Sequence, residues 1–404
     1  MNLDQVTLEL ARRKMDTSPS AGKIHRPRLG TGGNFGDVFF WDTAFTCLWA
    51  KHFAHELPVQ TSLDNLYRLA DSDGYIARQH LPSGEPKYLR SHPKSYAPPV
   101  LAWAELDLYD LHGDRARLQS VYPTLQRFHD SFRTLFRAPD GLFFSDPLGC
   151  GMDNLPRWPR GWTGDQAGQP FTVDDIHPSV PGREDIVRER ARICSWNRQG
   201  RWIDASAQAA FDALCMQRMA RLLGDEPAAA RYAAEHQELK DLINERCWSE
   251  ADAFYMDLAD GEQVRRLHIG AWWTLIAGIC PPERLERFTA HLTDPRTFGV
   301  VTPVPSLSAD DPDFRAAGDY WLGSSWAPTT YMVLRGLQAN GLDGLARQLG
   351  SSFLDTVVAV LEETGTLWEN YAPSSRAQGR IAQPDFVGWT GLATVAIPRE
   401  ILKT

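Results

Sequence analysis

Apolar and polar positions alternate along this chain in blocks that recur from one end to the other. In each block a loop rich in aromatic and polar residues leads into an apolar segment, and a more charged amphipathic segment follows. The spacing of the apolar residues predicts a helix for both kinds of segment. The apolar helices are predicted at residues 41–55, 97–112, 202–223, 267–279, 325–339 and 385–397. Their amphipathic partners are predicted at residues 58–70, 114–136, 226–246, 281–292 and 341–363.

These helix pairs predict an all-α fold. A helix that is apolar on every side must be buried, whereas an amphipathic helix keeps one face in water. The apolar helices are therefore expected inside a ring of helical hairpins, with the amphipathic helices outside. The amphipathic segment at residues 3–15 can supply the sixth outer helix and close the ring. We expect one domain over residues 1–404, with loop insertions at about 159–201 and 294–324.

The charge of the chain argues against several kinds of partner. Lys and Arg number 42 and Asp and Glu number 51, which gives a formal net charge of -9. No run of basic residues offers a stripe for phosphate groups, so nucleic acid and anionic membranes are not expected as partners. The longest apolar run, at residues 269–280, is too short to span a bilayer.

The cysteines and the N-terminal residues indicate a compartment. The six cysteines are scattered without a Cys-x-x-Cys pair, and the chain begins without the apolar stretch of a secretory signal. We therefore expect reduced thiols and a cytoplasmic location. A His-Glu-x-x-His motif and a calcium-loop spacing are also missing, so neither a metal nor another cofactor is expected.

Asp153 is the first candidate for a catalytic role. It stands in a stretch where glycines and Pro156 interrupt regular structure, and Met152 and Trp158 bring apolar surface beside it. A carboxyl group held against apolar surface keeps its proton at higher pH, as a general acid must. The alternative is an Asx turn, in which Asp153 and Asn154 bond only to their own backbone.

Glu369 is the second candidate. It lies beside Trp368 and Tyr371, and Asn370 can hold its side chain by a hydrogen bond. Two carboxylates that face each other across a sugar ring are the usual equipment for glycoside hydrolysis. The alternative for Glu369 is a solvated loop carboxylate with no special role.

The loops that lead into the inner helices open on one face of such a ring, so their side chains should converge. These loops alternate aromatic rings with single carboxylates or amides, which suits a neutral, hydroxyl-rich ligand such as a small carbohydrate or glycoside. The residues expected to bind this substrate are Phe40, Trp41, Asp42, Tyr75, Gln79, Arg157, Trp158, Trp321, Trp326, Asn370, Tyr371 and Trp389.

Two motifs resemble a known family. Gly151 to Trp158 resembles the Gly-Met-Asp-Asn-Ser-Pro-Arg-Trp signature of glycoside hydrolase family 63, and Trp368 to Tyr371 is similar to its Trp-Glu-Asn-Tyr segment. The resemblance extends to the family 37 trehalases, which share the architecture. It implies an (α/α)6 barrel and inverting hydrolysis of α-linked glucose or mannose, with Asp153 as general acid and Glu369 as general base. Departures from the family pattern, such as Leu155 in place of Ser, leave the sugar and the linkage open.

Two other functions are compatible with the same pattern. A sugar epimerase or isomerase on the same barrel would use histidines as acid and base, and His52, His55 and His268 are the nearer candidates, although all three fall within predicted helices. A non-catalytic carbohydrate-binding protein would use the aromatic pocket and leave the two carboxylates without a role.

Overall fold

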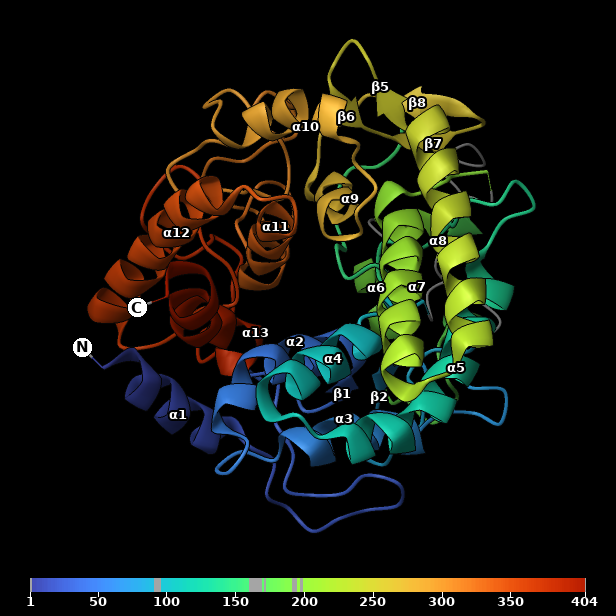
Figure 1. The fold of residues 1–404 in the computed structure, drawn as a ribbon. Helices are drawn as coiled ribbons and strands as arrows, with labels where there is room; N and C mark the ends of the chain where they lie inside the picture. The colour runs from blue at the N-terminus through green and yellow to red at the C-terminus, as the bar shows by residue number, and fades with distance from the viewer. Residues whose placement is uncertain are drawn as a thin grey trace.

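Helices form a closed ring in which inner and outer helices alternate along the chain (Figure 1). The computed structural model describes residues 2–90, 96–159, 169–170, 172–190, 195–196 and 199–403. The inner helices are α2 (Phe40–Ala50), α4 (Leu101–His112), α7 (Ile203–Leu223), α9 (Trp273–Ile276), α11 (Ala327–Ala339) and α13 (Val387–Gly391). Short 3-10 helices, η1 (Lys51–Phe53) and η5 (Ile269–Trp272), extend α2 and α9, and the π-helix η7 (Leu392–Leu402) continues α13. The outer helices are α1 (Leu3–Lys14), α3 (Val59–Arg68), α5 (Arg115–Phe136), α8 (Glu226–Arg246), α10 (Pro282–Thr289) and α12 (Asp343–Thr364).

Burial separates the two sets of helices as the apolar pattern predicts. Every residue of α2 and of α9 is buried, whereas the amphipathic helix α10 buries only Phe288 and Thr289. Each inner helix packs against the next around the ring, and η7 packs back against α2. Helix α1 packs against α13 and η7, so the N-terminal helix closes the outer layer beside the C-terminus (Figure 1). The predicted ring of helical hairpins is therefore confirmed.

The turn between α7 and α8 shows how the sequence sets a hairpin. Helix α7 ends at Gly224, whose φ of 83° is a left-handed conformation that a glycine adopts without strain. Asp225 follows at once and caps α8, because its side chain accepts a hydrogen bond from the backbone N–H of Ala228. One glycine and one aspartate thus reverse the chain between an inner and an outer helix.

Some elements depart from the helix-only prediction. Four pairs of very short antiparallel strands are present among the described residues: β1 (Val38–Phe39) with β2 (Gln79–His80), β3 (Gln169–Pro170) with β4 (Ser195–Trp196), β5 (Trp248–Ser249) with β6 (Phe254–Tyr255), and β7 (Asp257–Ala259) with β8 (Glu262–Val264). Part of the predicted insertion at 159–201 forms the helix α6 (Arg183–Arg190). Residues 160–168, 171, 191–194 and 197–198 of that insertion lie outside the described residues. The division into one domain with two insertions stays a prediction.

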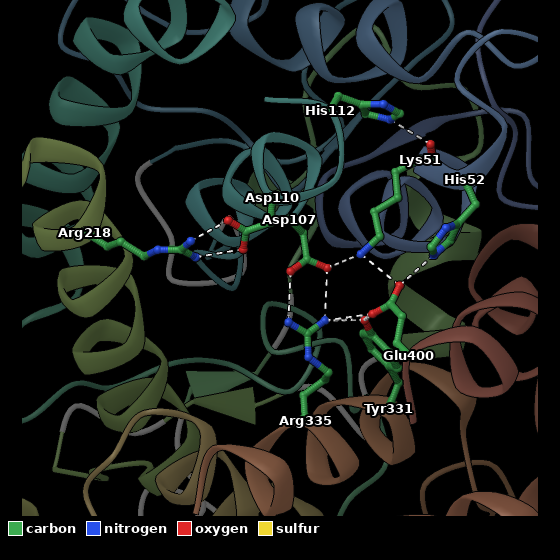
Figure 2. Close-up of polar contacts among 9 residues, drawn as sticks. All are labelled: Lys51, His52, Asp107, Asp110, His112, Arg218, Tyr331, Arg335 and Glu400. Atoms are coloured by element: carbon green, nitrogen blue, oxygen red, sulfur yellow. Dashed lines mark hydrogen bonds and ion pairs between the residues drawn. The ribbon is translucent and has the colours of Figure 1, made fainter. Parts of the chain in front are cut away.

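A buried cluster of charges joins the inner helices at the end where they finish (Figure 2). Asp107 of α4 accepts hydrogen bonds from Arg335 of α11, at 3.0 Å to each carboxylate oxygen, and from Lys51. Glu400 of η7 binds the same two cations and also His52, whose Nε2 lies 2.7 Å from it. Burial would raise the pKa of Asp107, but Arg335 and Lys51 outweigh it and hold that pKa at about 2. Paired charges thus connect four inner segments across the ring axis.

Candidate active site

One cavity collects many of the predicted residues at the end of the ring where the inner helices begin. Its volume is about 300 Å³, at the lower end of the range for small-molecule pockets. The predicted residues that line it are Phe40, Trp41, Asp42, Gln79, Asp153, Glu369 and Trp389. Asp153 and Glu369, although distant in the sequence, therefore share one cavity.

The first turn of α2 forms one wall. Phe40, Trp41 and Asp42 begin this helix, and the backbone N–H of Phe40 donates to the carbonyl oxygen of Arg78 at 2.8 Å. The pairing of β1 with β2 sets Phe39 opposite Gln79, so the Gln79 amide lies beside the start of α2. The Gln79 amide donates to Asp37 at 2.6 Å, which fixes its orientation at the cavity wall.

Asp153 lies in a loop at residues 148–158, here called the Asp153 loop. Gly151 has a φ of 75°, and a Cβ at that position would lie only 2.7 Å from the ring of Trp41. Glycine is therefore required both for the turn and for the close approach to Trp41. Asp153 itself is 9% exposed and lines the cavity. The Asp153 loop thus brings its carboxylate against the aromatic wall.

Arg157 anchors the Asp153 loop from behind and does not line the cavity. Its guanidinium donates to both carboxylate oxygens of Asp204, at 2.9 and 2.7 Å, and to both of Asp257, at 2.9 and 2.8 Å. The guanidinium also lies 3.9 Å over the ring of Trp202. The ring of His268 forms a further hydrogen bond with Asp257. Because the donors of Arg157 are occupied inside the protein, the geometry gives Arg157 an anchoring role in place of the predicted contact with substrate.

Glu369, which also lines the cavity, is held by backbone and side-chain hydrogen bonds. Its carboxylate accepts from the backbone N–H of Gln383 at 3.2 Å and from the hydroxyl of Tyr320 at 3.4 Å. Its carbonyl oxygen accepts from the indole N–H of Trp389 at 2.9 Å. The side chain is 3% exposed, so it is not the solvated loop carboxylate of the alternative interpretation.

Three carboxyl groups influence one another in this cavity. Burial is the main cause that raises the pKa of Glu369 to about 8, and the charges of Asp42 and Asp153 add to it. Burial also raises the pKa of Asp42 to about 7, with Arg78 opposing the rise and Asp153 supporting it. Burial in this cavity therefore favours the protonated forms of Asp42 and Glu369.

The other predicted binding residues lie outside the lining of the cavity. Trp321 and Trp326 are fully buried and stack on each other at 4.1 Å, behind Trp41 and Trp389. Asn370 and Tyr371 are also buried. They hold the chain after Glu369, since the Asn370 amide donates to the carbonyl of Ile381 and the Tyr371 backbone pairs with Ser325.

Tyr75 and Trp158 also lie elsewhere. The Arg90 guanidinium lies 4.6 Å over the ring of Tyr75. Trp158 packs edge-on against Trp202 at 6.1 Å, beside the network of Arg157. Both aromatic rings therefore have protein partners.

The cavity lining also contains polar and charged residues that were not among the predicted site residues. Tyr320 directly precedes Trp321, a predicted site residue, and its hydroxyl is the polar group that could have identified it. Asp37, Arg78 and Lys87 form a charged side of the cavity, in which Lys87 lies 3.3 Å from Asp37. No local motif marks Lys87, whose backbone N–H reaches the site by donating to the carbonyl oxygen of Gln79 at 2.9 Å. None of the described histidines lines the cavity, which leaves the epimerase interpretation without its acid and base.

Two carboxylates that share one cavity are the groups that glycoside hydrolysis uses. A family model described as the mannosylglycerate hydrolase MGH1-like glycoside hydrolase domain matches residues 38–390. The chain belongs to this family, which confirms the resemblance read from its motifs.

Individual relatives agree with this placement. A periplasmic trehalase from Pseudomonas aeruginosa is 25% identical over 414 residues, which cover 93% of this chain and 71% of the relative. An uncharacterized protein from Borreliella burgdorferi is 25% identical over 318 residues, or 78% of this chain, and the chain spans 59% of that protein's length.

Solved structures share the fold. A GH63 mannosylglycerate hydrolase from Thermus thermophilus in complex with glucose superposes with a TM-score of 0.73 at 21% identity, covering 97% of this chain and 99% of that one. A neutral trehalase from Saccharomyces cerevisiae superposes with a TM-score of 0.62 at 13% identity, covering 95% of this chain and 76% of that one. The predicted (α/α)6 barrel is confirmed by these likenesses.

Proposed function

We propose that this protein is an inverting glycosidase that releases an α-linked glucose or mannose from a small glycoside. The observation that carries the proposal is the shared cavity of Asp153 and Glu369. Both carboxylates come from loops at the same end of the ring, and aromatic and amide side chains line the space around them. Trp41 and Trp389 offer apolar ring faces to a sugar, while Gln79 and Asp42 offer hydrogen-bonding groups to its hydroxyls.

In the proposed mechanism Asp153 is the general acid and Glu369 is the general base. Asp153 gives its proton to the glycosidic oxygen as the bond to the anomeric carbon breaks, while Glu369 takes a proton from the water that attacks the opposite face. The reaction needs one proton on the two carboxyl groups together, because the acid must donate one while the base accepts one. The raised pKa of Glu369, about 8, supports the presence of that proton at neutral pH.

The charged side of the cavity suggests the class of leaving group. Arg78 and Lys87 face the cavity with one carboxylate, Asp37, beside them. A leaving group with its own carboxylate suits this side, and one structure of the Thermus thermophilus mannosylglycerate hydrolase contains D-glycerate. We therefore include α-mannosylglycerate and α-glucosylglycerate with trehalose in the substrate panel.

The decisive experiment follows hydrolysis of this panel by NMR. An inverting enzyme releases the β-anomer first from α-mannosylglycerate or α-glucosylglycerate, and it releases one β-glucose and one α-glucose from trehalose, before mutarotation mixes the forms. Asp153→Asn and Glu369→Gln should each lower kcat by about 100-fold or more, while the exposed Glu363→Gln serves as a matched control. Release of the sugar from a glycosylglycerate as the α-anomer first, or release of only α-glucose from trehalose, would reject inversion, and full activity of either variant would reject that residue's role.

The two roles are separated with an α-glycosyl fluoride. Fluoride leaves without needing much help from an acid, whereas the attacking water still needs a base. Asp153→Asn should therefore recover much of its activity on the fluoride, and Glu369→Gln should not. The opposite pattern would exchange the acid and base roles.

We also propose a cytoplasmic location. The five described cysteines, Cys47, Cys150, Cys215, Cys247 and Cys280, are free and buried, which suits a reducing compartment. Among the described residues, no helix combines the length and the apolar character needed to cross a membrane. Fractionation of the native cells, with a periplasmic marker as control, tests the proposal, and recovery with that marker would contradict it.

A further inference from the structure

Asn154, the residue after Asp153, clamps a second loop of the active site. Its side-chain amide donates to the carbonyl oxygen of Asp319 at 3.1 Å and accepts from the backbone N–H of Trp321 at 2.9 Å. These two peptide groups stand on either side of Tyr320, so one side chain fixes the backbone both before and after it. An Asx turn, in contrast, would use the amide only within its own loop.

Tyr320 adopts a backbone conformation that needs such support. Its φ of 60° is in the left-handed region, which disfavours a residue with a bulky side chain. The ring packs edge-on against Trp326 at 5.0 Å, and its hydroxyl reaches the Oε1 atom of Glu369 at 3.4 Å. The unusual backbone thus turns a hydroxyl donor toward a proposed catalytic carboxylate.

The loop that carries Tyr320, at residues 315–326, is also tied to the chain that follows Glu369. Ser325 and Tyr371 exchange two backbone hydrogen bonds, of 2.9 and 3.0 Å. Asp319 forms an ion pair with Arg380, whose backbone N–H donates to the carbonyl of Ala317 at 3.0 Å. The Asp153 loop, the Tyr320 loop and the Glu369 segment therefore form one connected set.

We propose that Asn154 and Tyr320 are positioning residues that couple the two catalytic carboxylates: Asn154 holds Tyr320, and the hydroxyl of Tyr320 orients the carboxylate of Glu369. This inference rests on the proposed function. With Gln383 N–H on one oxygen and Tyr320 on the other, the plane of the Glu369 carboxylate is defined. The Tyr320 bond, at 3.4 Å, is long, and such bonds often shorten when substrate is bound.

The hydrogen bond from Tyr320 favours the ionised form of Glu369, which is the form that acts as a base. Its contribution lowers the pKa of Glu369, against the larger effect of burial and against the charges of Asp42 and Asp153. The other charged residues on the cavity are Asp37, Arg78 and Lys87. Because all of these remain in the variants below, a change in the Glu369 pKa reports on the loss of the Tyr320 contact.

The test compares Tyr320→Phe, Asn154→Ala and the double variant with the wild type. Each single variant should lower kcat/KM at pH 7 by roughly tenfold, the worth of one hydrogen bond to a charged group. Each should also move the alkaline limb of kcat/KM to higher pH, because Glu369 ionises less readily. The double variant should resemble Tyr320→Phe alone, since both changes break the same connection.

Asn340→Ala is the control for a purely structural effect. The Asn340 amide also joins two segments, through the carbonyls of Leu275 and Gly336 at 3.0 and 2.8 Å, but it lies at the far end of α11. It should lower the Tm without moving the alkaline limb. If Asn154→Ala behaves in the same way, or if the losses in the double variant are fully additive, the proposal is wrong.

A second measurement reads the Glu369 pKa without substrate. Each protein is compared with a second protein that differs from it only by Glu369→Gln, and the difference in Tm between the two is measured as a function of pH. The midpoint of this difference should move to higher pH in Tyr320→Phe and in Asn154→Ala. An enzyme that cleaves nothing in the panel would reject the proposed function, while this titration would still confirm or overturn the coupling of Asn154 to Glu369 through Tyr320.

Discussion

Replacing Glu369 by glutamine should stabilise the fold, and the gain should grow with pH. The folded state raises the pKa of this carboxyl group from 4.5 to about 8, chiefly by burial. A raised pKa means that the folded protein favours the neutral form. The favourable contribution of the neutral group is complete below pH 4.5 and is lost as the pH rises through about 8. Glutamine has nearly the same shape and cannot ionise, so it avoids that loss.

The size of the effect follows from linkage. One unit of pKa shift corresponds to about 1.36 kcal/mol, so ionisation of Glu369 destabilises the fold by about 1 kcal/mol at pH 5 and about 3 kcal/mol at pH 7. The unfolding entropy of a chain of 404 residues is about 0.85 kcal/mol/K. Glu369→Gln should therefore raise the Tm by roughly 1 °C at pH 5 and roughly 4 °C at pH 7.

Differential scanning fluorimetry from pH 4.5 to pH 8.5 measures this trend, with circular dichroism to confirm that both proteins are equally folded. Glu363→Gln, which removes an exposed carboxylate near the end of α12, provides the matched control and should leave the Tm nearly unchanged. A gain in Tm that is the same at every pH would show that the charge of Glu369 is not its cause. A lower Tm at pH 7 would refute the reasoning, because the carboxylate would then stabilise the fold.

Three further predictions concern other parts of the molecule. Because the carboxyl pair must keep one proton and the pKa of Glu369 is about 8, kcat/KM should fall as the pH rises through about 8, and a rate that is constant up to pH 10 would contradict this. Lys87→Ala should raise KM for α-mannosylglycerate severalfold but leave KM for neutral trehalose unchanged; equal changes would show that the lysine does not read the charge of the leaving group. Asp107→Asn should lower the free energy of unfolding by about 3–5 kcal/mol, because Arg335 and Lys51 lose a buried carboxylate partner, and kcat should be retained. A much smaller decrease in the free energy of unfolding, measured by urea denaturation, would contradict a stabilising role for the cluster.

The fold could be predicted because the apolar pattern of each helix indicates whether it lies inside or outside the ring. Wholly apolar segments such as 202–223 must be buried, and amphipathic segments such as 281–292 must cover them. The short strands could not be predicted, because pairs of two residues, such as β1 with β2, are too brief to produce an alternating pattern. Their effect is nevertheless large, since this pairing sets Gln79 beside α2, and Lys87 in turn bonds to the backbone of Gln79.

The candidate site could be predicted only in part, because residue type does not determine the direction of a side chain in a loop. Asp153, Trp41 and Glu369 line the cavity, as expected from loops that open on one face of the ring. Arg157 belongs to the same motif, but two buried aspartates distant in the sequence draw its guanidinium away. Tyr320 depends on a left-handed backbone that a neighbouring loop enforces, and a single sequence carries no local signal for such a contact.

The cavity contains carboxyl groups whose burial is unfavourable, and hydrogen bonds hold the loops around them. Burial raises the pKa values of Asp42 and Glu369, so their ionised forms are unfavourable in the fold. Behind the cavity, the donors of Arg157 are matched by the carboxylates of two buried aspartates, which fixes one end of the Asp153 loop. An unfavourable local arrangement persists only where several separate contacts of the surrounding structure hold it in place. A loop held by three separate contacts, through Gly151, Asn154 and Arg157, meets that condition, so Asp153 is kept on the cavity that it shares with Asp42 and Glu369.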